Sequence, residues 1–391
     1  MTNRLSHPRV RHAALSVVSL AGGVSLAVIP AATLAISARI FTLAETGVIA
    51  VAIMVATFVG QVTFAAVVES RLSSRAADRR VTFPVWLAVT SLAAALGVAL
   101  NYRNPVVLCV ALPVLVASLE VGRGVSVAER LDRREIWASA SVGAGALIGV
   151  LSAFAGFDWG LIPVVAGIFA ATCVRSIPVP HVASHREGAA TAWVVADVGI
   201  TGIVFPLLNT LILTVLGPAD AVLFTAISTV SGLLAIPLNF LRLRLLKEHS
   251  RSDVWVSVGS LVLAVMALLV FEVLGFFSLL FGSSWTIQST LLPLLVACAW
   301  RAASLAPTLP FTALRRMGHA RLVTTLRAGA SALSFLLAGL ALLSQNIAWV
   351  FAALFLAELL SGAVYEIARR RVVRAEALGE SDRATPQDGL A

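Results

Sequence analysis

The chain has 391 residues, of which 59% are hydrophobic and only 13% are charged, and its mean hydropathy is +0.94. This composition excludes a soluble enzyme, because a soluble core cannot hide so much apolar surface. The net charge of +9 would suit a nucleic-acid-binding protein, but the basic residues form short clusters between apolar runs of about 20 residues. That arrangement is typical of a multi-pass membrane protein and predicts no nucleic-acid partner.

The apolar runs predict about twelve membrane-spanning helices. The first run follows Arg4, Arg9 and Arg11 and is too long for a cleavable signal peptide, so we interpret it as an uncleaved helix. The predicted spans cover residues 13–38, 46–68, 82–100, 105–122, 136–155, 159–174, 191–216, 219–241, 254–274, 287–313, 322–343 and 347–367.

The distribution of arginine and lysine predicts the orientation. With the amino terminus inside, 25 of the 29 basic residues fall in cytoplasmic connections, and only Arg39 and Arg103 fall in the opposite set. We therefore predict an all-α integral protein of the cytoplasmic membrane with both termini in the cytoplasm. The outer connections are too short for a catalytic domain; the longest, residues 272–285, is aromatic and is expected to lie at the outer interface.

A polar stretch at residues 175–188, which contains Pro178 and Pro180, divides the chain into halves of similar length. We predict one six-helix bundle at residues 1–180, a second at residues 189–370, and a polar, disordered cytoplasmic tail at residues 375–391. Residues 42–53 align with residues 216–227 and share a valine, an alanine and an isoleucine. Because six is even, the halves would have the same orientation, as expected for parallel repeats that rock about a central cavity.

Several connections carry a resemblance to a known family. The segments are Ser37-Ala38-Arg39-Ile40, Glu45-Thr46-Gly47, Leu216-Gly217-Pro218-Ala219-Asp220-Ala221 and Leu280-Phe281-Gly282. Together with the twelve-helix layout, they resemble the multidrug/oligosaccharidyl-lipid/polysaccharide (MOP) flippase superfamily, and within it the polysaccharide or O-antigen flippases. The resemblance implies alternating-access export of a polyprenyl-diphosphate-linked oligosaccharide for cell-surface polysaccharide. Membrane lipids and glycan polymerase or assembly proteins would be its partners, and we expect a monomer.

Two arginines are the candidate cations for such an anionic substrate. Arg301 interrupts an apolar run in the tenth span, where an uncompensated charge costs several kcal/mol, and its planar fork suits phosphate oxygens. Snorkelling to the surface or a pair with a carboxylate is the alternative for Arg301. Pro293, Pro307 and Pro310 flank it and predict a bend in this span. Arg39, at the outer end of the first span, is either a substrate-binding residue or an interfacial anchor.

Three further charges lie within predicted spans. Glu358 is the carboxylate closest to the bilayer centre and would either take up a coupling proton or form a static pair with Arg301, which we favour. Asp197 early in the seventh span and Arg327 in the eleventh are further coupling or ion-pair candidates, although end-of-helix snorkelling would also explain Arg327.

Gln61 and Asn209 are uncharged polar residues deep in apolar runs, at positions that the half-repeat brings toward the central cleft. Their amides could bind sugar hydroxyls, or they could form interhelical hydrogen bonds worth about 0.6 kcal/mol. The three cysteines and six histidines show no ligand-pair spacing. We therefore expect no metal site, no cofactor and no catalytic residue.

Three other functions compete with the flippase interpretation. A multidrug exporter of the same superfamily would share the fold, but such exporters often hold a carboxylate in the first helix of a half, and the first span here has none. A major-facilitator transporter would have twelve helices, yet the glycines of its loop motif are absent around Asp78-Arg79-Arg80. A membrane-embedded polysaccharide polymerase would need larger outer loops than this chain provides.

Overall fold

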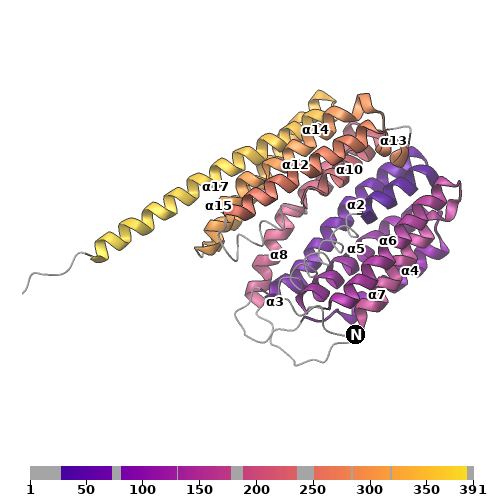
Figure 1. Cartoon of the computed structure of the whole chain (residues 1–391), viewed down its shortest axis with the longest axis horizontal. Helices are drawn as coiled ribbons and strands as arrows, with labels where there is room; N and C mark the ends of the chain where they lie inside the picture. The colour runs from indigo at the N-terminus through magenta and orange to yellow at the C-terminus, as the bar shows by residue number, and fades with distance from the viewer. Residues whose placement is uncertain are drawn as a thin grey trace, which may run out of the picture.

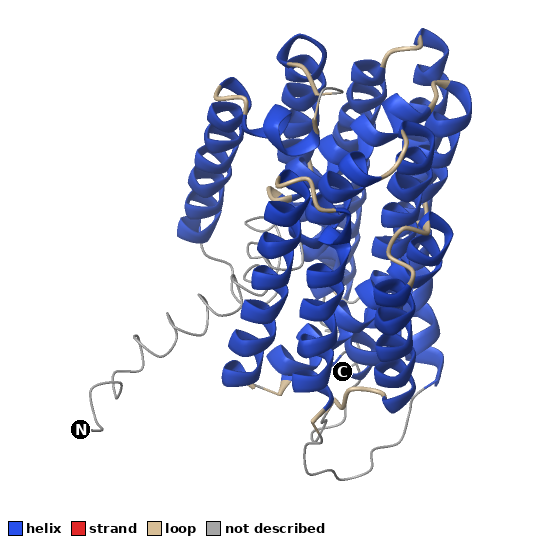
Figure 2. Ribbon diagram, turned by 90° about the vertical axis from the view of Figure 1, so that its right-hand side faces the viewer, coloured by secondary structure: helices blue, strands red, loops and turns tan. Residues whose placement is uncertain are grey.

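The computed structural model describes residues 28–72, 81–129, 131–177, 188–235, 251–282, 285–317 and 319–384. Residues 13–27 of the first predicted span, most of the predicted boundary between the halves and residues 385–391 of the predicted tail lie outside these ranges. The described part is all-helical and contains no strand (Figures 1 and 2).

Eight described helical stretches are long and apolar enough to cross a membrane, so the chain is a multi-pass membrane protein. Three shorter apolar helices, Val28–Ile40, Val85–Leu100 and Val258–Val273, also coincide with predicted spans. The span predicted at residues 219–241 begins in α10 (Pro218–Gly232) and continues outside the described residues. The total of twelve spans and the cytoplasmic position of the termini therefore stay predictions.

The helices after the first short helix form one packed group: α2 (Leu43–Phe64), the π-helical turn η1 (Ala65–Glu69), α3 (Ser70–Leu72), α4 (Val85–Leu100), α5 (Pro105–Ala128), α6 (Asp132–Phe154), η2 (Asp158–Gly160) and α7 (Leu161–Ser176). Small residues set the closest approach within it. A Cβ atom added to Gly145 of α6 would lie 2.4 Å from the Pro163 carbonyl oxygen and 3.0 Å from Gly167 Cα of α7. Spans that are apolar on every side lack a single hydrophobic face, so such glycine contacts decide which helices pack together.

The second group contains α8 (Gly188–Gly202), α9 (Val204–Val215), α10, α12 (Arg251–Val273), α13 (Phe276–Phe281), α14 (Ile287–Ala303), α15 (Leu305–Arg316), α16 (Ala320–Ala341), η3 (Leu342–Ser344) and α17 (Ile347–Ala384). The tenth predicted span is interrupted at Ser304, between α14 and α15, as its prolines predict. Pro307 has no N–H for the carbonyl of Ala303, and at the same turn the Ser304 hydroxyl donates to the Arg301 carbonyl at 2.6 Å. A similar interruption at Ile203 separates α8 from α9, three residues before Pro206.

The two groups meet along α2, which contacts α8, α9 and α10. We call the end of the molecule at which α2 begins the Arg39 end, and the end at which α3 lies the Arg71 end. At the Arg39 end, a Cβ atom on Gly47 of α2 would lie 2.8 Å from Pro218 Cβ of α10, so the two segments of the predicted internal repeat touch each other. In Figure 1, α10 and α13 lie at the same end of the molecule as the start of α2, while α15 and the last turns of α17 lie away from α3 at the other end.

The last helix, α17, continues to Ala384 and extends beyond the other helices (Figure 1), whereas the sequence predicts a disordered tail from residue 375. The residues after the span are mainly arginine, alanine and glutamate, which have high helix propensity. A helix already nucleated inside the bundle needs only propagation through such residues.

Candidate functional site

Arg301 lies near the middle of the apolar span Ile287–Leu314, one turn from the interruption at Ser304. Its guanidinium carbon stands 4.0 Å from the centroid of the Trp300 ring and 5.9 Å from that of Phe205 on α9. Among the described residues, its buried Nε has no hydrogen-bond partner, and its guanidinium forms no ion pair with a carboxylate. The side chain is thus a partly exposed cation held by aromatic rings, with donors left to bind an anion.

The second arginine of this region is paired. Arg327 Nη1 of α16 donates to Asp197 Oδ2 of α8 at 2.5 Å, across 130 residues of sequence. The Asp197 side chain is only 7% exposed and that of Arg327 is 22% exposed. Sequence analysis selected both residues as ion-pair candidates without predicting that they would be each other's partner.

Glu358 of α17 completes the set of intramembrane charges. It lies within electrostatic range of both Arg301 and Arg327 but forms an ion pair with neither. The static Arg301–Glu358 pair that the sequence favoured is therefore not formed among the described residues. We call Asp197, Arg301, Arg327 and Glu358 the charged quartet; it contains two arginines and two carboxylates from four helices.

An aromatic cluster adjoins Arg301. Phe205 of α9 packs on Trp300 at 5.6 Å between ring centroids, Trp300 lies 6.3 Å from Phe351 of α17, and Phe351 stacks on Phe224 of α10 at 5.2 Å. These four rings join α9, α10, α14 and α17 directly beside the charged quartet. Phe224, Trp300 and Phe351 are buried in the core, so this cluster packs the four helices together behind Arg301.

The two polar candidates are placed differently from each other. Asn209 is fully buried, and its amide nitrogen donates to the Thr225 hydroxyl at 2.8 Å, which in turn donates to the Ala50 carbonyl at 3.3 Å. Asn209 therefore links α9, α10 and α2, and its Oδ1 has no partner within the described part of the chain. Gln61 of α2 is exposed, with its Oε1 3.4 Å from the position of a Cβ atom on Gly202.

Arg39 lies far from the charged quartet, at the end of the molecule where α2 begins. Its guanidinium stacks 3.8 Å from the Phe154 ring centroid of α6, and its Nη2 donates to the Leu279 carbonyl of α13 at 2.6 Å. Residues 240 apart in sequence are thereby joined across the two helix groups. The structure does not bring Arg39 together with Arg301.

Sequence analysis missed a second set of buried charges, in the first helix group. Arg175 of α7 makes a bidentate ion pair with Glu135 of α6: Nη2 donates to Oε1 at 2.6 Å and Nε donates to Oε2 at 3.2 Å. Both side chains are 2% exposed. Glu120 of α5 lies within electrostatic range of Arg175. A spacing of 40 residues gives no sequence signal for this pair, and Arg175 is predicted as a residue of a cytoplasmic connection.

A second missed feature lies in the connection at residues 272–285, which is not simply an interfacial segment. Glu272 is 2% exposed and accepts hydrogen bonds from Trp285 Nε1 at 2.8 Å and from the Thr290 hydroxyl at 2.5 Å. Phe277 and Phe281 of α13 are also buried, whereas Phe276 and Leu279 are exposed. The buried carboxylate thus holds this connection onto the second group and positions the Leu279 carbonyl for Arg39.

Comparisons with known proteins define the fold. No family model matches the chain, and no curated protein matches it. Among solved structures, a MATE in complex with MaL6 is similar with a TM-score of 0.56 at 13% identity, covering 96% of this chain and 99% of that chain. A multidrug resistance MATE family transporter of the MOP superfamily is similar in its outward-facing conformation, with a TM-score of 0.52, 13% identity and coverage of 96% and 99%. The inward-facing conformation gives a TM-score of 0.50, 13% identity and coverage of 95% and 96%.

The chain therefore has a MATE-like transporter fold over nearly its whole length. The fold that the predicted resemblance implies is confirmed, whereas membership of the MOP superfamily and of its polysaccharide or O-antigen branch stays a prediction. The TM-scores for the inward-facing and outward-facing structures are close, so the similarity does not indicate which of these conformations this chain adopts. Its conformation has to be inferred from contacts within the chain itself.

Proposed function

We propose that the protein is an alternating-access transporter of the cytoplasmic membrane. The contacts at the Arg39 end support a gate: a charged hydrogen bond joins Arg39 to Leu279, and Gly47 packs on Pro218. The helical structure is already interrupted at Ile203, between α8 and α9, and at Ser304, between α14 and α15. These two positions can therefore act as hinges. With the predicted orientation, the Arg39 end faces outward, and the contacts correspond to a state closed on the outside.

We further propose that the substrate is a polyprenyl-diphosphate-linked oligosaccharide. The observation that supports it is the Arg301 side chain, a cation within an apolar span that has no ion-pair partner among the described residues. Holding such a charge without a partner costs several kcal/mol, and a diphosphate that binds its fork would offset that cost. Asp197 pairs with Arg327, which leaves Arg301 as the arginine of the quartet without an ion pair among the described residues.

A multidrug exporter is the second candidate. Glu358 carries a carboxylate without an ion pair in the described part of the chain, and such a group would suit a cationic compound. The compared structures include multidrug resistance transporters, which adds to this alternative. The two candidates differ in which charge of the quartet meets the substrate.

Mass spectrometry of lipid extracts distinguishes them. Cells that lack the gene should accumulate polyprenyl-diphosphate oligosaccharides, and wild-type protein or Arg103→Ala should reverse the accumulation. Arg301→Ala should not reverse it, and Arg301→Lys should reverse it partly, because lysine keeps the charge but loses the fork. Unchanged lipids, together with increased sensitivity of these cells to cationic drugs, would reject the lipid-linked substrate in favour of the multidrug exporter.

A further inference from the structure

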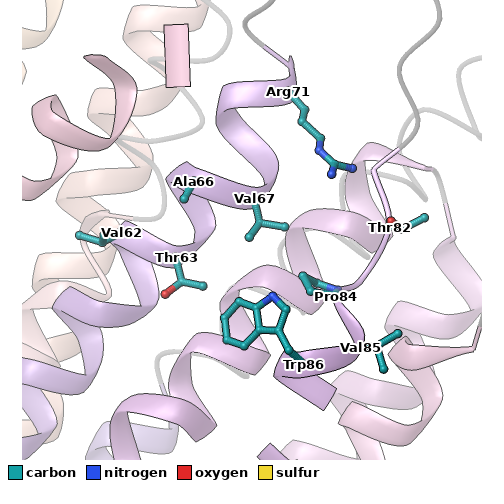
Figure 3. A pocket seen from close by; sticks show the side chains of 9 residues that line it. All are labelled: Val62, Thr63, Ala66, Val67, Arg71, Thr82, Pro84, Val85 and Trp86. Atoms are coloured by element: carbon teal, nitrogen blue, oxygen red, sulfur yellow. The ribbon is translucent and has the colours of Figure 1, made fainter. Parts of the chain in front are cut away.

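A groove of about 710 Å³ lies on the outside of the first helix group, between the last turns of α2 and the start of α4. Figure 3 shows the side chains that line it, from α2, η1, α3 and the segment that leads into α4. Its walls are mainly apolar, and its polar groups are the Arg71 guanidinium and two threonine hydroxyls. Its lining includes Val62, Ala66, Val67, Arg71, Thr82 and Trp86.

The π-helical turn determines which side chains face the groove. One extra residue in η1 rotates the residues after it relative to those before it. Phe64 and Val68 pack against α5, where a Cβ atom on Gly124 would lie 2.3 Å from Phe64 Cε2 and 3.1 Å from Val68 Cγ2. Ala66 and Val67 line the groove, and Val67 also packs into the core cluster with Ala117 and Val121 of α5.

The groove is left open by the described helices. Val85 and Trp86, at its α4 side, are 77% and 58% exposed. The groove has Arg71 towards one end and the exposed Trp86 towards the other (Figure 3), and membrane proteins often place arginine and tryptophan near the level of lipid headgroups. An occupant that matches this lining has one apolar and one anionic part, as a bilayer lipid has.

We propose that this groove binds an anionic phospholipid of the surrounding bilayer, with an acyl chain against Val67 and Trp86 and the phosphate on Arg71. Charge complementarity favours an anionic over a zwitterionic lipid. The sequence at residues 71–80 carries four arginines and a single acid, so the net charge of this stretch is strongly positive. The site is separate from the charged quartet, and lipid binding there does not depend on what the protein transports.

The test is native mass spectrometry of the purified full-length protein, released from mixed micelles that contain phosphatidylglycerol and phosphatidylcholine in equal amounts. Wild-type protein should retain phosphatidylglycerol preferentially. Arg71→Gln should lower the ratio of retained phosphatidylglycerol to phosphatidylcholine about fivefold, since one arginine near an anionic surface contributes about 1 kcal/mol. Arg103→Gln is the matched control, because it removes an exposed arginine at the opposite end and should leave the ratio unchanged.

A second variant tests the apolar part of the site. Ala66→Phe should fill the groove and reduce retention of both lipids, provided that it elutes as wild type in size exclusion; otherwise Arg71→Gln alone decides. Equal retention of the two lipids by wild-type protein, or the same ratio for Arg71→Gln and Arg103→Gln, would overturn the proposal. Displacement of phosphatidylglycerol by polyprenyl phosphate at equal concentration would also overturn it, because the groove would then be a site for the carrier lipid.

Discussion

The buried Glu135–Arg175 pair gives a prediction whose magnitude can be worked out from the structure. The pair is two-pronged, both side chains are 2% exposed, and Arg175 Nη1 also approaches the Leu119 carbonyl at 3.5 Å. Gly122 makes room for the arginine, since a Cβ atom there would lie 2.6 Å from Arg175 Cδ. Glu135→Gln preserves the shape of the side chain but leaves the guanidinium without its compensating charge.

Two energy scales give different expectations for this change. Removing one partner of a buried ion pair costs about 3–5 kcal/mol, because an uncompensated charge remains. An average polar interaction between membrane helices is worth only about 0.6 kcal/mol. Since Glu120 lies within electrostatic range and glutamine can still accept a hydrogen bond, we expect the lower part of the first range, about 3 kcal/mol.

Unfolding of the purified protein in mild detergent measures the effect. Glu135→Gln should reduce the free energy of unfolding by about 3 kcal/mol, and the apolar double variant Glu135→Leu/Arg175→Met should recover most of the loss because no charge stays buried. The matched control is Asp158→Asn, which breaks the Arg103–Asp158 pair. That pair has the same 2.6 Å separation, but its side chains are 69% and 51% exposed, so the loss should stay below about 1 kcal/mol. Equal losses for Glu135→Gln and Asp158→Asn would refute the reasoning.

Three further changes probe the packing, the gate and the quartet. Gly145→Val should lower the apparent Tm, because overpacking against α7 costs about 1–3 kcal/mol, whereas Gly143→Val, with open space around it, should not; equal Tm values would contradict this. Arg39→Gln should reduce the population closed at the Arg39 end about fivefold, for a hydrogen bond worth about 1 kcal/mol, as measured by spin-label distances across that end; an unchanged distance distribution would exclude the gate. Glu358→Gln should impair transport and flatten its pH profile, because this carboxylate has no static ion-pair partner among the described residues; a normal pH profile would rule out proton coupling through it.

The positions of the spans could be predicted from the sequence, because the transfer of an apolar run into hydrocarbon depends on that run alone. Within the described ranges, all eleven apolar helices found by length and composition coincide with predicted spans. The helix interruption at Ser304 was also predictable, because Pro307 cannot donate a hydrogen bond to the carbonyl one turn earlier, and this effect depends only on the local sequence. Arg301 and Glu358 could also be recognised from the sequence, because a charged residue within an apolar run is energetically unfavourable in the membrane.

The partners of those charges were decided by the tertiary structure. Asp197 pairs with Arg327 across 130 residues, Arg175 with Glu135 across 40, and Arg39 reaches Leu279 across 240. Which helices become neighbours depends on close contacts such as that between Gly47 and Pro218. A run that is apolar on all sides carries no pattern that specifies its neighbour. The sequence therefore determined which residues are charged within the membrane, and only the packing of the described helices decided that Arg301 and Glu358 would be left without an ion pair.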